Sequence, residues 1–184
     1  MKLFTVGPVE MFDEVKSIRA DKDSVPYFRT KEFSEMMLAT DELLRKFAHA
    51  DEGAKTVYLT ASGTAAMEAT VMNCFTEQDR LLVINGGSFG QRFVDICEVH
   101  HIPHDVLKLE YGEILGESQL RLFREKNYTA LLVNIDETST GQLYDIALLS
   151  DFCQSKGMYL IVDAISSFLC DKFESIKPVY DLMM

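Results

Sequence analysis

Short runs of consecutive apolar residues, separated by segments of helical periodicity, constrain the fold of this chain more than any other feature. Residues 81–84, 131–135 and 159–162 are apolar almost throughout. A strand that is apolar on both sides has to be covered on both faces of its sheet. The intervening segments carry apolar residues at helical spacing, for example Phe89 and Phe93. This alternation predicts an α/β fold, with a mostly parallel sheet covered by helices on both faces.

The same patterns predict the order of the elements. The expected strands are residues 56–60, 81–84, 106–109, 131–135 and 159–162. The expected helices are residues 31–49, 64–75, 88–101, 117–127 and 146–156. Residues 1–30, which Gly7-Pro8 and Pro26 interrupt, are expected to form an irregular N-terminal arm. Residues 31–184 are expected to form one large domain.

Composition excludes several classes of function. The 184 residues carry a net charge of −11, which disfavours binding to nucleic acid or to an anionic membrane. No apolar run approaches the length of a membrane span, and the apolar start of the chain is soon followed by acidic residues, unlike a signal peptide. The cysteines form no CxxC pair, so we expect reduced core residues in a cytoplasmic protein: Cys74, Cys97, Cys153 and Cys170.

The motif Ser62-Gly63-Thr64 lies between an expected strand and an expected helix. Ligands of parallel α/β folds bind at the carboxyl ends of the strands. A glycine, two hydroxyls and the free N–H groups of a helix N-terminus suit one phosphate group. Because Ser and Thr are also common helix caps, the motif alone fits a simple cap equally well. A dinucleotide site would need a GxGxxG motif here, which the sequence lacks.

Asp163 and Phe89 follow other expected strands. Asp163 comes directly after four apolar residues, either as an ordinary acid at a strand end or as the partner of a pyridine nitrogen. Phe89 stands between Gly87 and Gly90, where it would stack on a flat ring or pack into the core. His100 and His104 have the spacing of a metal site on a helix, but Pro103 interrupts that helix, so no metal site is expected.

Six blocks in this order resemble the class V aminotransferases of pyridoxal-phosphate fold type I. The resemblance is to the branch that includes serine–pyruvate, alanine–glyoxylate and 2-aminoethylphosphonate–pyruvate transaminases. It covers essentially the whole chain. The blocks are residues 4–9, 29–33, 62–68, 85–90, 134–141 and 162–167.

The resemblance implies roles in binding pyridoxal 5′-phosphate. It assigns Ser62, Gly63 and Thr64 to the phosphate group. It places Phe89 against one face of the pyridine ring and Ile165 against the other.

Further roles concern the ring substituents and the substrate. The resemblance places Asp163 at the ring nitrogen and the hydroxyl of Thr138 beside the cofactor. It places Gly7 in an arm that passes near the substrate.

The lysine that binds this cofactor as a Schiff base is missing from the pattern. In the resemblance, residues 179–184 match the strand that leads to that lysine, which would then lie beyond Met184. Lys172 and Lys177 come too early and are expected on the surface. We therefore expect a large domain that is incomplete at its C-terminus, without the small domain, without a catalytic residue and inactive alone.

The function implied by the resemblance is transamination of a small amino acid or an aminophosphonate, with a 2-oxo acid as acceptor. The complete protein is expected to be a homodimer, with no nucleic acid or membrane partner. The alternative is a non-catalytic module that binds a phosphate ligand or is completed by a partner chain.

Overall fold

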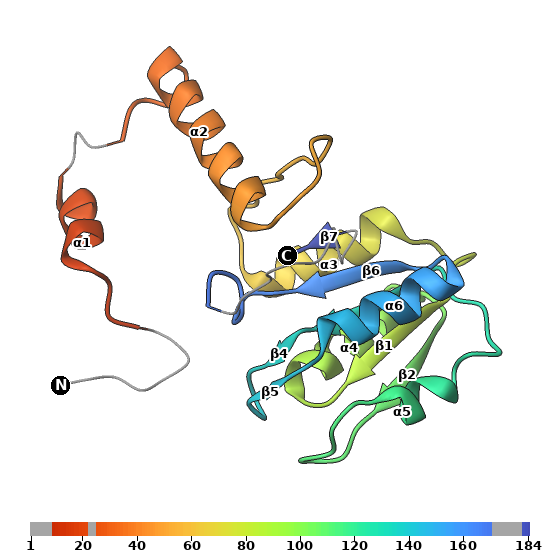
Figure 1. Ribbon diagram of the computed structural model, residues 1–184. Coiled ribbons are helices and arrows are strands. Elements are labelled where there is room, and N and C mark those ends of the chain that lie inside the picture. The colour runs from red at the N-terminus through yellow and green to blue at the C-terminus, as the bar shows by residue number, and fades with distance from the viewer. Residues whose placement is uncertain (1–8, 22–24, 171–181) are drawn as a thin grey trace. The chain divides into compact units, whose positions relative to one another are not determined.

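The computed structural model describes residues 9–21, 25–170 and 182–184 (Figure 1). Gly7, Lys172, Lys177 and residues 179–181, all named above, lie outside the described residues. Contacts divide the chain into two units, Met1–Val57 and Tyr58–Met184, each with its own elements. The expected boundary between an arm and a domain near residue 30 stays a prediction.

The second unit contains a five-stranded parallel sheet. Its strands are β1 (Leu81–Asn85), β2 (His104–Lys108), β3 (Ala130–Asn134), β6 (Tyr159–Asp163) and β7 (Leu182–Met183). Their order is β2-β1-β3-β6-β7, and every neighbouring pair is parallel. The carboxyl ends of all five strands therefore lie at one edge of the sheet.

Helices cover both faces of this sheet (Figure 1). The helices α3 (Gly63–Cys74) and α4 (Ser88–Val99) pack on one face, and α5 (Glu117–Arg121) and α6 (Ile146–Lys156) pack on the other. Successive strand residues alternate between the two cores, because side chains in a strand point to opposite faces. The three-layer α/β fold that the sequence predicts is thus confirmed.

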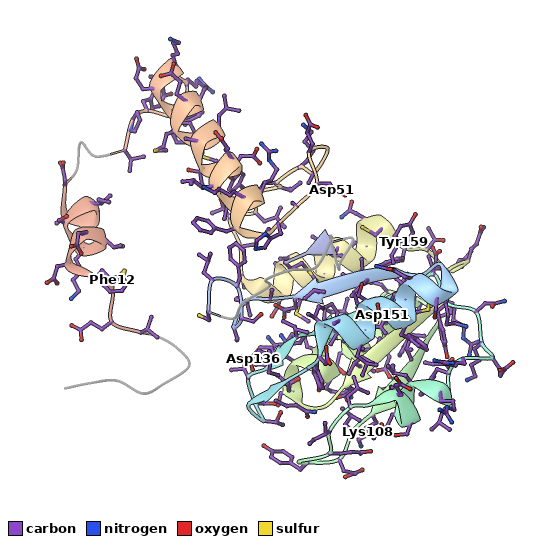
Figure 2. All side chains as sticks on the ribbon, viewed as in Figure 1. Phe12, Asp51, Lys108, Asp136, Asp151 and Tyr159 are labelled. Atoms are coloured by element: carbon purple, nitrogen blue, oxygen red, sulfur yellow. The ribbon has the colours of Figure 1, made fainter. Side chains whose placement is uncertain are left out.

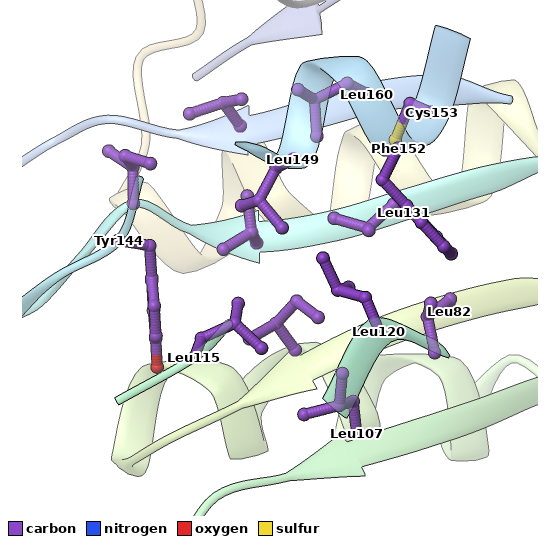
Figure 3. Packing of buried hydrophobic residues seen from close by; sticks show 14 of the residues in the cluster. Leu82, Leu107, Leu115, Leu120, Leu131, Tyr144, Leu149, Phe152, Cys153 and Leu160 are labelled. Carbon is purple, nitrogen blue, oxygen red and sulfur yellow. The ribbon is translucent and has the colours of Figure 1, made fainter. Parts of the chain in front are cut away.

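Figure 3 shows the core beneath α6. Leu149 and Phe152 of α6 face Leu131 of β3 and Leu160 of β6. All four side chains are at most 5% exposed. Burial of such side chains stabilises the fold by about 1.5–3 kcal/mol each.

Local sequence features explain where α6 begins and where it ends. Its N-cap is Asp145, whose carboxylate accepts hydrogen bonds from the N–H groups of Ala147 (3.0 Å) and Leu148 (3.2 Å). The helix ends at Gly157, which has a φ of 63° in the left-handed region that favours glycine.

A short hairpin that the sequence analysis did not predict follows β3. Its strands, β4 (Asp136–Glu137) and β5 (Gln142–Leu143), pair antiparallel. The hairpin lies at the edge where the strands of the main sheet end, and Asp136, labelled in Figure 2, belongs to it. The hairpin carries Thr138 in its turn.

The first unit contains α1 (Asp13–Ala20) and α2 (Lys31–Phe47). The expectation of an irregular arm is wrong for the residues of α1, where acids in the first turn favour a helix. The helix α2 begins after Thr30, whose hydroxyl accepts a hydrogen bond from the N–H of Phe33 at 3.3 Å.

Other expectations need correction. Residues 56–60 form no strand, and Tyr58 and Leu59 are exposed, because β-prone residues form a strand only with a partner in a ladder. The helix expected over residues 117–127 ends at Arg121 and continues as turns. Within the described ranges, no helix has the length and apolar character needed to cross a membrane.

The cysteines are core residues only in part. Cys97 and Cys153 are buried as expected, whereas Cys74 and Cys170 are exposed.

Candidate functional site

Four segments meet at the carboxyl edge of the sheet: the N-termini of α3 and α4, the β4–β5 turn, and the residues after β6. The hydroxyl oxygens of Thr138 and Ser166 lie 2.7 Å apart and join the turn to the segment after β6. The side chain of Ile165 packs against Gly63, where a Cβ atom would lie 3.1 Å from the Ile165 Cδ1. The fold therefore brings together motifs that lie far apart in the sequence.

The N-terminus of α3 combines a cap with unused donors. The Oγ of Ser62 accepts a hydrogen bond from the N–H of Ala65 at 3.2 Å, so Ser62 is the N-cap. Among the residues that the structure describes, the N–H groups of Gly63 and Thr64 have no hydrogen-bond partner. Free N–H groups at a helix N-terminus attract an anion. The cap and the phosphate site are therefore compatible interpretations of this motif.

Arg92 of α4 brings a positive charge to the same place. Its Nη1 donates a hydrogen bond to the Thr64 Oγ1 at 2.7 Å. Its guanidinium carbon lies 4.9 Å from the centre of the Phe89 ring, within the range of a cation–π interaction. Arg92 thus links the α3 N-terminus to Phe89.

Asp163 is a buried carboxylate at the end of β6, with 4% of its surface exposed. Its Oδ1 accepts from the N–H of Ile165 at 3.1 Å, and its Oδ2 accepts from the Nδ2 of Asn134 at 2.9 Å. Burial raises the pKa of Asp163, and the nearby Glu137 raises it further. The two hydrogen bonds and the charge of Arg92 oppose this rise. Such a carboxyl group is suited to a cationic partner.

Asn134 lies directly opposite Asp163 in the register between β3 and β6. Its Nδ2 is used by Asp163, but its Oδ1 is buried and has no hydrogen-bond partner within the described part of the chain. A buried polar atom without a partner is uncommon in native proteins. The Asn134–Asp163 pair therefore still has one buried hydrogen-bond acceptor, the Asn134 Oδ1, available.

Glu137 is fully buried and holds the N-terminus of α4. Its carboxylate accepts hydrogen bonds from the N–H groups of Phe89 (3.2 Å) and Gly90 (2.9 Å). It also accepts from the Ser139 hydroxyl at 2.7 Å. Phe89 itself is half-buried.

The structure thus brings together all seven described candidates, namely Ser62, Gly63, Thr64, Phe89, Thr138, Asp163 and Ile165. Sequence reasoning assigned no role to Arg92, Asn134 or Glu137, although the last two lie in the block of residues 134–141 that carries the resemblance. One signal was available for Arg92, which follows Phe89 by three residues and so lies on the same side of α4. No periodicity singles out Asn134 or Glu137.

The histidines make other contacts. The His100 Nε2 lies 2.7 Å from the Glu68 Oε1, and the His104 Nδ1 lies 2.9 Å from the carbonyl oxygen of Ile102. A hollow of about 350 Å³ lies beside His100 and His101, near the C-terminal ends of α3 and α4 and away from the candidate site.

Comparison with known proteins assigns the family. Residues 11–182 match the model of the aminotransferase class-V family, and the chain belongs to that family. This agrees with the resemblance seen in the sequence.

Individual relatives give the same result. The chain is 33% identical over 144 residues to the soluble hydrogenase 42 kDa subunit of Anabaena cylindrica, covering 76% of this chain and 37% of that protein. It is 29% identical over 178 residues to a 2-aminoethylphosphonate–pyruvate transaminase of Vibrio vulnificus, covering 90% and 45%. The structure of an alanine–glyoxylate aminotransferase from Nostoc sp. matches with a TM-score of 0.80 and 26% identity, covering 89% and 43%. The chain therefore spans less than half the length of these relatives.

Class V aminotransferases depend on pyridoxal phosphate, and the residues present fit that cofactor. The α3 N-terminus offers free N–H groups beside Arg92, which suit a phosphate. Phe89 and Ile165 offer an aromatic and an aliphatic surface. Asp163, whose pKa is raised by burial, gains from a protonated ring nitrogen as its partner.

Proposed function

We propose that the full-length protein transfers an amino group from a small amino acid or an aminophosphonate to a 2-oxo acid, and that Tyr58–Met184 supplies most of its cofactor site. The observation that carries this proposal is the buried Asp163 at the same sheet edge as the unused donors of Gly63 and Thr64. Membership of the class V family supports it. The Vibrio relative's name supports the choice of substrates.

The first group of residues would bind and orient the cofactor. The N–H groups of Gly63 and Thr64 would donate to the phosphate, with Ser62 holding the helix that presents them. Phe89 and Ile165 would contact opposite faces of the pyridine ring and exclude water from it.

Asp163 would hold a proton on the ring nitrogen, because its buried carboxylate strongly favours a cationic neighbour. Pyridoxal phosphate, when bound, supplies an electron sink for the negative charge that develops at the substrate carbon. Thr138 would place a hydroxyl beside the ring.

The reaction also needs an amine that binds the cofactor and moves a proton. Among the described residues, no lysine is hydrogen-bonded to Thr64, Thr138 or Asp163. We therefore propose that residues 1–184 alone do not catalyse transamination, and that the catalytic lysine belongs to another part of the full-length protein. A homodimer of that protein is part of the same proposal.

A non-catalytic module completed by a partner chain is the second candidate. The name of the Anabaena relative, a subunit of a soluble hydrogenase, favours it. Treatment of the full-length protein with pyridoxal phosphate and borohydride separates the two functions. Fixation of the cofactor on one peptide supports the enzyme, whereas cofactor that is lost on dialysis supports the module.

The role of Asp163 is tested by Asp163→Asn in the full-length protein. We expect the variant to lose most of its turnover while it keeps its circular dichroism spectrum, because the ring nitrogen loses its ionic partner. Asp151→Asn, on the exposed side of α6, is the matched control (Figure 2). Near-normal turnover of Asp163→Asn would remove Asp163 from the mechanism.

A further inference from the structure

The helix that presents Phe89 has no cap within its own segment. Its N-cap is Gly87, which has no side chain to accept from the first turn. The N–H groups of Ser88, Phe89 and Gly90 would otherwise lack partners within the helix at this partly buried end. The chain satisfies them with side chains from the β4–β5 hairpin, about 50 residues away.

Glu137 is the centre of this arrangement. Its Oε2 accepts from the Gly90 N–H at 2.9 Å, and its Oε1 accepts from the Phe89 N–H at 3.2 Å. The Ser139 hydroxyl donates to the same Oε1 at 2.7 Å and accepts from the Ser88 N–H at 2.9 Å. Hydrogen bonds to an ionised acceptor are about twice as strong as neutral ones, and a carboxylate at a helix N-terminus is further stabilised by the helix dipole.

Glu137 packs closely against the loop that contains Gly87. The carboxylate is fully buried. A Cβ atom at Gly87 would lie 2.6 Å from the Glu137 Cδ, so only glycine allows the loop to approach this closely. The backbone of Phe89 is therefore fixed by one side chain of a distant segment.

Glu137 also directly precedes Thr138, the hydroxyl residue of the site. The Glu137 carboxylate binds the backbone N–H of Phe89, a residue that the proposed function places at the ring. We propose that Glu137 is a positioning residue, which holds Phe89 where its ring stacks on the pyridine ring of the cofactor. This proposal rests on the proposed function of the site.

A positioning role and a general structural role of Glu137 predict effects on different ligands. If Glu137 acts through Phe89, its loss weakens binding of a ligand with an aromatic ring but not of inorganic phosphate. If Glu137 merely stabilises the fold, its loss weakens both ligands. A positioning role also requires that Glu137 has no effect once Phe89 is absent.

The experiment measures the affinity of the full-length protein for pyridoxal 5′-phosphate and for inorganic phosphate. The variants are Glu137→Gln, Phe89→Leu and the double variant, with Glu98→Gln at the exposed far end of α4 as the control. The amide of Glu137→Gln keeps one acceptor oxygen and loses the other, so one of the two N–H bonds is lost. We expect pyridoxal phosphate to bind about 3- to 10-fold more weakly, as for loss of one aromatic contact, with phosphate affinity unchanged.

In the Phe89→Leu background, we expect Glu137→Gln to change the affinity for pyridoxal phosphate by less than about twofold. Equal weakening of both ligands, or a full effect of Glu137→Gln in that background, would overturn the proposal while leaving the proposed function intact. Failure of the unsubstituted protein to bind pyridoxal phosphate would contradict both. If Glu137→Gln does not fold, Ser139→Ala, which removes only the bridging hydroxyl, is judged by the same criteria.

Discussion

In the cofactor-free protein, Asp163 lowers the free energy of unfolding at neutral pH, because folding raises the pKa of its carboxyl group. Burial raises the pKa of this carboxyl group above its ordinary value of 3.8, so the folded state binds more protons than the unfolded state in the window above that value. The contribution of Asp163 to the free energy of unfolding therefore falls as pH rises through this window and stays low above it.

Asp163→Asn should remove this pH dependence. Asn134 can rotate its amide so that its unpaired Oδ1 accepts from the amide introduced at position 163, which keeps the number of hydrogen bonds unchanged. We expect the cofactor-free variant to be at least as stable as the parent at about pH 7, with a smaller loss of stability between about pH 4 and pH 7. Urea unfolding of the parent and the variant across this pH range measures their free energies of unfolding. A variant that is less stable at neutral pH would show that Asp163 stabilises the fold.

Arg92 should influence the same carboxyl group. Its positive charge opposes the rise in the pKa of Asp163, so Arg92→Met should raise that pKa further. The pKa is followed by the carbon-13 chemical shift of the Asp163 carboxyl group during a pH titration. Arg121→Met, on the surface of α5, is the control and should leave the pKa unchanged. An unchanged or lowered pKa in Arg92→Met would contradict the proximity of Arg92 to Asp163.

Among the elements, α6 tests the fold independently of the site. Asp145 caps it with two hydrogen bonds, so Asp145→Ala should lower the free energy of unfolding by about 1 kcal/mol. Asp151→Ala, within the same helix and exposed, should have almost no effect. Denaturant unfolding measures both variants. Equal losses of stability would mean that the Asp145 cap contributes nothing specific.

The sequence predicts elements well where burial is complete. Residues 81–84, 131–135 and 160–162 are buried on both faces, so their composition reflects their surroundings directly. Residues 56–60 have a similar composition but form no strand, because a strand depends on a partner that composition does not reveal. The helix α1 and the β4–β5 hairpin were missed, since both are too short to show a period.

The residues of the candidate site likewise divide into those that the sequence predicts and those that it does not. Ser62, Gly63 and Asp163 could be predicted as candidates because each lies directly after a predicted strand or within a recognisable motif. Glu137 lies in the block of residues 134–141, but the sequence suggested no role for it because its partners lie 47 and 48 residues away in the chain, which no local pattern reports.

At the scale of the whole molecule, the parallel direction of the strands explains why the candidate site residues lie at one edge of the sheet. All five strands end at one edge, so loops that follow different strands meet there. The segments after β1, β3 and β6, together with the start of α3, carry the residues that we propose contact the phosphate, both faces of the ring and the ring nitrogen. In the proposed function, the chain contributes most of a cofactor site, although it spans less than half of its relatives' length.

The position of the phosphate group tests this account most directly. The measurement is a crystal structure of the full-length protein with pyridoxal phosphate. We predict that the phosphate lies within hydrogen-bond distance of the N–H groups of Gly63 and Thr64, with Asp163 at the ring nitrogen. A phosphate bound instead by the loop at Gly86 and Gly87 would contradict it.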